Sequence, residues 1–155
     1  MSKSLYFLDA ARSEDQRRKM LDLESRGVCV MCLPFIKKES IKQNPVLYEN
    51  EGWLVSKNDY PYEGSRFHFL ISAKRHIELP TELYMKEWAM LGKAINWVER
   101  AFKIKGASLV MRFGDGKFTQ SSIQHLHAHI IVGVARDKND PNAESIKVSI
   151  GTKGK

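Results

Sequence analysis

The spacing of apolar and polar residues along the chain predicts two helices. Ser13 is followed three residues later by Gln16, which is the pattern of a capping box, and acidic residues occupy the first turn. We therefore expect a short helix over residues 13–26, which ends at Gly27. In residues 81–104 apolar side chains recur every three or four positions. This period predicts a long amphipathic helix with one buried face.

Short apolar segments separated by turn residues predict the strands. They cover residues 48–57, 67–72, 107–113, 123–133 and 146–150. Asn, Asp, Pro and Gly between the first two segments predict a turn. Strands connected through hairpins, with helices inserted separately, indicate an α+β fold on an antiparallel sheet of about five strands.

Length and composition fit one domain. The chain has 155 residues, of which 43% are hydrophobic, enough for one core. We expect a single domain over 1–155, comprising a helix (13–26), a cysteine-containing knuckle (28–36), a core (46–133) and a tail (134–155). No segment approaches the ~20 apolar residues of a membrane helix, and the N-terminus lacks a signal-peptide pattern. We therefore expect a cytoplasmic protein without a membrane partner.

The charge balance is basic, with a formal net charge of +7 at pH 7. A positive balance suits a polyanionic partner such as a nucleotide. The Lys and Arg residues are spread along the whole chain, however, which is typical of a solvated surface. We therefore do not expect nucleic acid as a partner.

Histidines form the most distinctive polar pattern of the chain. The five histidines are His68, His76, His125, His127 and His129. The last three alternate with Leu126 and Ala128. Because alternate residues of a strand share a face, we expect three imidazole rings on one face, about 6.5–7 Å apart. Three interpretations fit such a row: a metal site, a nucleophile with supporting rings, or an anion-binding patch.

The two cysteines, Cys29 and Cys32, have C-x-x-C spacing. Two cysteines do not make the disulfide framework of a secreted protein. In a reducing compartment this spacing indicates a metal site or a redox pair. The alternative is two small apolar side chains buried within an apolar segment.

Three separate segments together resemble the histidine-triad family. Residues 122–131 (Ser-Ile-Gln-His-Leu-His-Ala-His-Ile-Ile) resemble its main signature, in which three histidines alternate with apolar residues. Residues 68–77 resemble its second signature, a strand that runs from a histidine to a Lys-x-His-Ile end. The C-x-x-C pair resembles the knuckle of zinc-containing members. The resemblance covers residues 28–133 and implies a HIT-like fold that hydrolyses or transfers nucleoside monophosphates.

The resemblance also implies catalytic roles. His127 corresponds to the residue that attacks the α-phosphorus and forms a nucleotidyl-histidine intermediate, while its other ring nitrogen donates to a backbone carbonyl. His129 would bond a non-bridging phosphate oxygen, and Ser122 lies on the leaving-group side. His125 is the first triad histidine. His68 supports the triad from a neighbouring strand or is a buried structural histidine.

Substrate-binding positions follow the family pattern less closely. Asn58 or Asp59 corresponds to the residue that holds the ribose, although both also fit as plain turn formers. The family's polar amide upstream of the triad is absent. Arg112, Asp115 and Gln120 are the candidates to replace its phosphate contact. An adenine nucleotide is the favoured substrate.

The resemblance implies structural Zn²⁺ held by Cys29, Cys32, His76 and His125. Two sulfurs and two imidazoles suit tetrahedral zinc, with no position left for a water molecule. The alternative, a catalytic metal on His125, His127 and His129, is disfavoured because alternate residues of a flat strand converge poorly on one ion.

The sequence leaves the acceptor open. A hydrolase acting on a phosphoramidate or a dinucleoside polyphosphate is the first hypothesis. A phosphorylase or nucleotidyltransferase of the same fold is the second, and a non-catalytic, zinc-stabilised nucleotide-binding protein is the third. Family members commonly pair through the long helix and a sheet edge, so a homodimer is expected.

Overall fold

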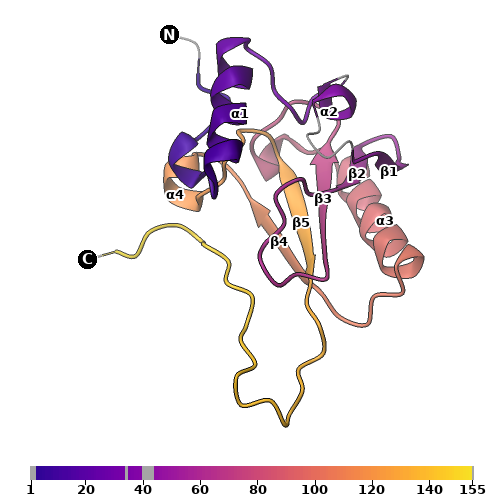
Figure 1. Ribbon diagram of the computed structural model, residues 1–155. Helices are drawn as coiled ribbons and strands as arrows, with labels where there is room; N and C mark the ends of the chain where they lie inside the picture. The colour runs from indigo at the N-terminus through magenta and orange to yellow at the C-terminus, as the bar shows by residue number, and fades with distance from the viewer. Residues whose placement is uncertain (1–2, 34, 40–43, 155) are drawn as a thin grey trace.

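A five-stranded antiparallel sheet forms the centre of the computed structural model, which describes residues 3–33, 35–39 and 44–154 (Figure 1). The strands are β1 (Val46–Glu49), β2 (Trp53–Lys57), β3 (Phe67–Ala73), β4 (Ser108–Arg112) and β5 (His127–Val132). Their order in the sheet is β1-β2-β3-β5-β4. This arrangement confirms the predicted α+β class.

The helices begin where local hydrogen bonds cap them. Helix α1 (Glu14–Ser25) starts after Ser13, whose side chain accepts from the backbone N–H of Gln16, as the capping pattern predicts. The long helix α3 (Met85–Ala101) starts four residues later than predicted. The Glu87 carboxylate caps the backbone N–H of Tyr84, and residues 80–82 form a separate 3-10 turn, η2 (Pro80–Glu82).

The strands predicted at residues 48–57 and 146–150 differ from the structure. Residues 48–57 are not one strand, because Asn50 turns the chain: its Oδ1 accepts from the N–H groups of Gly52 and Trp53, and this turn separates β1 from β2. Residues 146–150 form no strand. They lie in the tail, which leaves β5, loops away from the sheet and returns beside the short helix α4 (Gly116–Thr119) (Figure 1).

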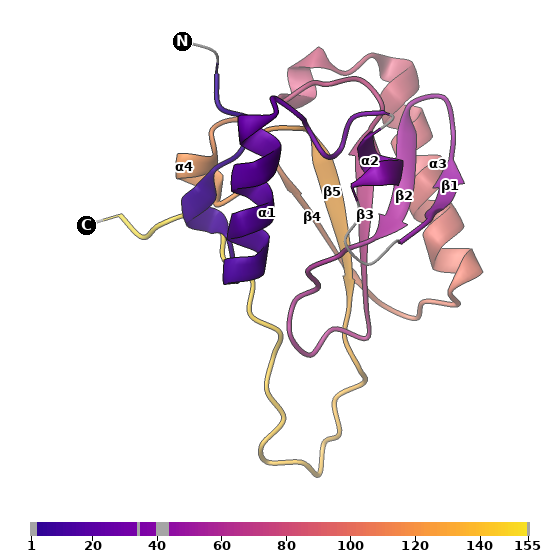
Figure 2. The ribbon, with the colours of Figure 1, turned by 45° about the horizontal axis from the view of Figure 1, so that its top comes forward.

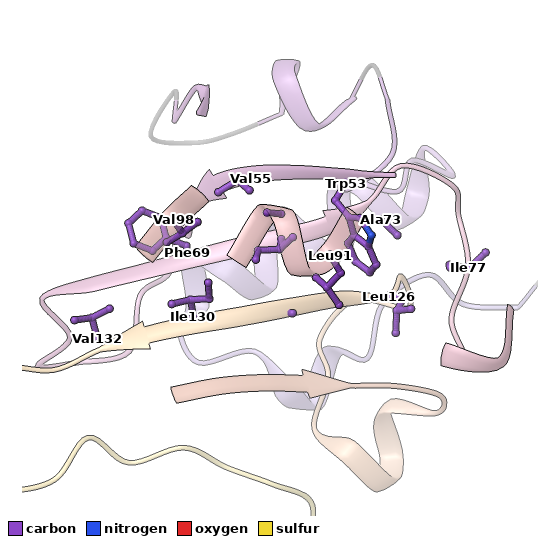
Figure 3. Packing of buried hydrophobic residues seen from close by; sticks show 13 residues of the cluster. Trp53, Val55, Phe69, Ala73, Ile77, Leu91, Val98, Leu126, Ile130 and Val132 are labelled. Atoms are coloured by element: carbon purple, nitrogen blue, oxygen red, sulfur yellow. The ribbon is translucent and has the colours of Figure 1, made fainter. Parts of the chain in front are cut away.

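The core lies between one face of the sheet and α3 (Figure 3). Trp53, Phe69 and Ile71 are fully buried there against Leu91 and Val98 of α3. These strand residues alternate with others that point to the opposite face. That opposite face lies under α1 and the N-terminal segment, so that α1 and α3 lie on opposite sides of the sheet (Figure 2). The side chains of His127 and His129 line a pocket on this face.

Candidate active site and metal cluster

His127 opens β5 and is held in a fixed orientation. Its Nδ1 lies 2.6 Å from the backbone carbonyl oxygen of His125. Because a carbonyl only accepts, Nδ1 carries the proton and Nε2 keeps the lone pair. His127 is almost fully buried, and burial lowers its pKa to about 4. The ring is therefore neutral near pH 7, and its nucleophilic nitrogen needs no deprotonation.

His129 and His68 form a hydrogen-bonded chain. The backbone N–H of Tyr62 donates to Nδ1 of His68 at 3.0 Å, so His68 carries its proton on Nε2. That nitrogen lies 2.8 Å from Nδ1 of His129. His129 consequently accepts on Nδ1 and carries its own proton on Nε2. Burial lowers the pKa of both rings, that of His68 to about 3.

Arg112 is a buried cation beside His129. Its side chain donates to Tyr62 Oη at 2.9 Å and to the carbonyl of Ser149 at 2.7 Å. Its Nη1 lies 3.5 Å from Nε2 of His129. Both of these nitrogens carry protons, so the two groups are donors directed at the same region. Such a pair suits an anionic oxygen placed between them.

Two pockets meet at His127 and His129, which line both. The first lies between the sheet and α1 and is lined by apolar and polar side chains. Its lining includes Gln16, Met20, Ser56, Asn58, Asp59, Tyr60, Leu70 and Ser72. The second lies on the other side of the triad and is lined by Asp9, Arg12, Tyr62, Arg112, Gln120, Lys147 and Ser149. Ser122 lines both pockets.

The nucleotide-binding residues expected from the sequence are divided between the two pockets. Asn58 and Asp59 line the first. Asn58 caps its own turn by accepting from the N–H of Tyr60, and Asp59 accepts from Asn44 at 2.7 Å. Gln120 lines only the second pocket, with a left-handed backbone (φ 57°). The three residues therefore do not form one subsite.

The row of three histidines was predicted incorrectly. Strand β5 begins only at His127, so His125 lies before it. The His125 ring turns toward the cysteines instead of sharing a face with the other two. The rings of His127 and His129 do share a face, with their centroids 4.9 Å apart, closer than the strand repeat because the rings lean together. This grouping does not support a metal site made of His125, His127 and His129.

Cys29, Cys32, His76 and His125 converge in one cluster, and all four are residue types that bind metal ions. One ligand atom from each lies within 4.8 Å of all the others. Nδ1 of His125 lies 3.5 Å from Cys29 Sγ and 3.6 Å from Cys32 Sγ. Nε2 of His125 donates to the carbonyl of Ala73 at 2.7 Å, which leaves the Nδ1 lone pair directed at the sulfurs. The donor set and its tautomer fit tetrahedral zinc.

Tyr62 and Arg12 are among the residues of the site that the sequence analysis did not find. Tyr62 stacks on His68 with ring centroids 4.8 Å apart, and the Arg12 guanidinium lies 4.3 Å above the Tyr62 ring. Tyr62 lies in a segment whose Asn, Asp, Pro and Gly residues already predict a turn, so the sequence pattern indicates no separate role for Tyr62. Arg12 precedes the segments that resemble the family, so no motif pointed to it.

The comparisons with known proteins agree with this geometry. Residues 29–140 match the family model described as the scavenger mRNA decapping enzyme C-terminal binding family. The chain belongs to this family, within the histidine-triad superfamily. No curated protein matches this histidine-triad chain significantly.

Solved structures show the same fold. A HIT family hydrolase from Clostridium thermocellum is 29% identical, with a TM-score of 0.54, over 74% of this chain and 95% of that one. A protein titled Hit Like Protein is 24% identical, with a TM-score of 0.51, over 64% and 97%. A hypothetical protein from Leishmania major is 21% identical, with a TM-score of 0.50, over 68% and 76%.

In the described part of this histidine-triad chain, no helix has the length and apolar character needed to cross a bilayer.

Proposed function

We propose that this protein transfers a nucleoside monophosphate group from its substrate to Nε2 of His127 and then to water. The observation that carries the proposal is the hydrogen bond from His127 Nδ1 to the His125 carbonyl, 2.6 Å long, in a neutral and buried ring. It fixes the proton on one nitrogen and the nucleophilic lone pair on the other. A protein that only bound nucleotides would not need this arrangement.

The first step forms a bond from Nε2 to the α-phosphorus and breaks the bond to the leaving group. The bonding electrons depart with the leaving group, and the charge on the phosphoryl oxygens rises. The Nε2–H group of His129 is placed to donate to one of these oxygens. In the second step water attacks phosphorus and releases one proton. The P–N bond breaks, and its electrons return to His127.

The first pocket supplies groups for the nucleoside. The Ser72 Oγ and Tyr60 Oη atoms are buried and have no hydrogen-bond partner among the described residues, and both residues line this pocket. Unpaired buried hydroxyls are costly, so a polar ligand here would satisfy them. Asn58 and Asp59 lie at the same pocket, which keeps them candidates for the ribose hydroxyls.

Structural zinc in the cysteine–histidine cluster is part of the proposal. The metal would tie residues 29–32 to the ends of two strands through His76 and His125. It has no part in bond breaking, because the four protein ligands would fill its coordination sphere.

A homodimer is also proposed: β4 is an edge strand with Leu109 half exposed, which provides a surface for pairing. Light scattering of the purified chain would measure its mass in solution.

Turnover by matched variants tests the proposal. Wild-type protein and His127→Ala are incubated with adenosine 5′-phosphoramidate and with diadenosine tetraphosphate, and the products are resolved by chromatography. We expect AMP from the wild type and a loss of at least about 10³-fold in His127→Ala. The zinc content of both proteins should stay at one per chain. Equal turnover by the variant would contradict the nucleophile assignment.

A further inference from the structure

Residues 5–7 pair with residues 122–124, the segment that directly precedes His125. Tyr6 and Ile123 face each other there in an antiparallel bridge. Backbone hydrogen bonds on the two sides of the bridge join the Phe7 N–H to the Ser122 carbonyl at 3.1 Å and the Gln124 N–H to the Leu5 carbonyl at 2.8 Å. The N-terminal segment is therefore attached to the part of the chain that leads into β5.

The hydroxyl group of Tyr6 holds the backbone on both sides of Cys29. Its Oη donates to the carbonyl of Val28 at 2.8 Å and accepts from the N–H of Val30 at 2.9 Å. Only 4% of Tyr6 is exposed, so water has little access to replace these bonds. One side chain thus connects the backbone around a cysteine of the cluster to the segment before β5.

The peptide group that follows His125 is held from two directions. Its N–H, which belongs to Leu126, donates to the carbonyl of Ile77 at 2.6 Å. Its carbonyl, which belongs to His125, accepts from Nδ1 of His127. The chain on the other side of His125 is held by the pairing with residues 5–7. The N-terminal segment is consequently one of two supports for the carbonyl that orients His127.

Helix α1 holds the N-terminal segment in place. The Glu24 carboxylate accepts from the N–H of Leu5 at 3.0 Å, and the Tyr6 ring lies in one apolar cluster with Leu23 of α1. Tyr6 and α1 both precede residues 29–140, the region that matches the family model. The match to the family therefore assigns no role to Tyr6.

We propose that Tyr6 is a positioning residue for two parts of the site, Cys29 in the cluster and His127 on β5. The inference rests on the proposed function, in which His127 reacts and the cluster holds zinc. Tyr6 lines the first pocket, but its hydroxyl group is already used by the bonds to Val28 and Val30. Loss of the hydroxyl group therefore loosens the backbone around Cys29 and the pairing before β5, while the ring still fills its place against α1.

Tyr6→Phe in the full-length, zinc-loaded protein removes only the hydroxyl group and tests this inference. Tyr84→Phe makes the same change at an exposed tyrosine, and Val98→Ala lowers stability from the α3 side of the sheet. We expect Tyr6→Phe to release zinc to a chromogenic chelator about tenfold faster or more. Its kcat should fall about tenfold, while KM changes less than about twofold. Both controls should match the wild type in zinc release and in kcat.

Amide hydrogen exchange, followed by peptide mass spectrometry, needs neither turnover nor metal release. We expect faster exchange in Tyr6→Phe than in either control at residues 28–32 and at residues 122–126, with exchange in β2 unchanged. A lower melting temperature as the sole effect of Tyr6→Phe, or faster exchange in only one of the two segments, would overturn the inference. Absence of turnover by the wild type would instead count against the proposed function, and the exchange result would still decide the role of Tyr6.

Discussion

The carbonyl oxygen of His125 accepts the hydrogen bond that orients His127, while the ring of the same His125 faces Cys29 and Cys32. One residue therefore belongs both to the proposed metal cluster and to the support of the proposed nucleophile. The ring is fixed a second time by its bond to the Ala73 carbonyl. A change in the position of His125 would therefore also move the carbonyl that orients His127, the proposed nucleophile.

Loss of the cluster should lower activity without removing any reacting group. We expect Cys32→Ser to lose zinc and to reduce kcat about tenfold or more, with a smaller change in KM, because His125 no longer holds the His127 ring in place. Zinc is measured by elemental analysis and activity by steady-state kinetics. Ser25→Ala, a change in an exposed residue at the end of α1, is the control. Retention of one zinc per chain by Cys32→Ser would contradict the ligand assignment.

The hydrogen bonds that connect Tyr62, His68 and His129 predict a second effect on kcat. His68→Phe keeps an aromatic ring against Tyr62 but removes the donor to Nδ1 of His129. We expect kcat to fall about tenfold or more, because the proton of His129 is no longer held on Nε2. Thermal melting shows whether the variant remains folded. Unchanged kcat in a folded variant would assign His68 a structural role only.

Acid should destabilise the protein over a defined pH range. Burial lowers the pKa of His68 to about 3 and that of His129 further, whereas the unfolded chain titrates near pH 6.5. Below pH 6.5 the unfolded state thus binds protons that the folded state does not. The free energy of unfolding should fall as pH decreases from about 6.5 toward 3, by roughly 1.4 kcal/mol per pH unit for each histidine.

Urea unfolding of zinc-loaded protein at several pH values measures this slope. His68→Phe is the matched control, because it retains the metal cluster and lacks one of the three rings whose pKa burial lowers, His68, His127 and His129. Its slope should be smaller by about one proton. Identical slopes for the two proteins would show that His68 does not contribute.

Gly116, beside the second pocket, has no room for a larger side chain. A Cβ atom there would lie 2.6 Å from Phe7 Cβ and 2.7 Å from the Ser121 carbonyl oxygen. Gly116→Ala should therefore destabilise the fold by about 1–3 kcal/mol. Gly92→Ala, in α3 with no atom within 4 Å of the new Cβ, should instead stabilise it by about 0.5–1 kcal/mol. Thermal melting compares the two, and similar melting temperatures would contradict the packing around Gly116.

Local sequence signals predicted much of the fold. The Ser13 capping pattern and the apolar period of α3 depend on neighbouring residues alone, and both helices formed where these signals lie. The break at Asn50 was missed because the apolar character continues across it, and the turn depends on side-chain hydrogen bonds. The segment 146–150 has strand-like alternation but pairs with no strand of the described chain; its Ser149 carbonyl accepts instead from the side chain of Arg112, which no local signal reveals.

The site was predictable where the residues form a motif. The cysteine pair, His76 and His125 converge as the resemblance implied. The ring of His125 departs from the strand pattern because it contacts the cysteines and the carbonyl of Ala73. These partners are distant from His125 in the sequence. Arg12 and Lys147 reach the second pocket only through the folded positions of the two chain ends. Only the three-dimensional structure shows that both residues line this pocket.

Trapping the covalent intermediate shows whether His127 is the nucleophile. Wild-type protein is mixed with substrate and denatured within milliseconds to seconds at alkaline pH, where a P–N bond survives. Peptide mass spectrometry then locates the nucleotidyl group. We expect a nucleotidyl adduct on His127, absent from His127→Ala. An adduct on another residue, or multiple turnovers with none formed at any time point, would contradict it.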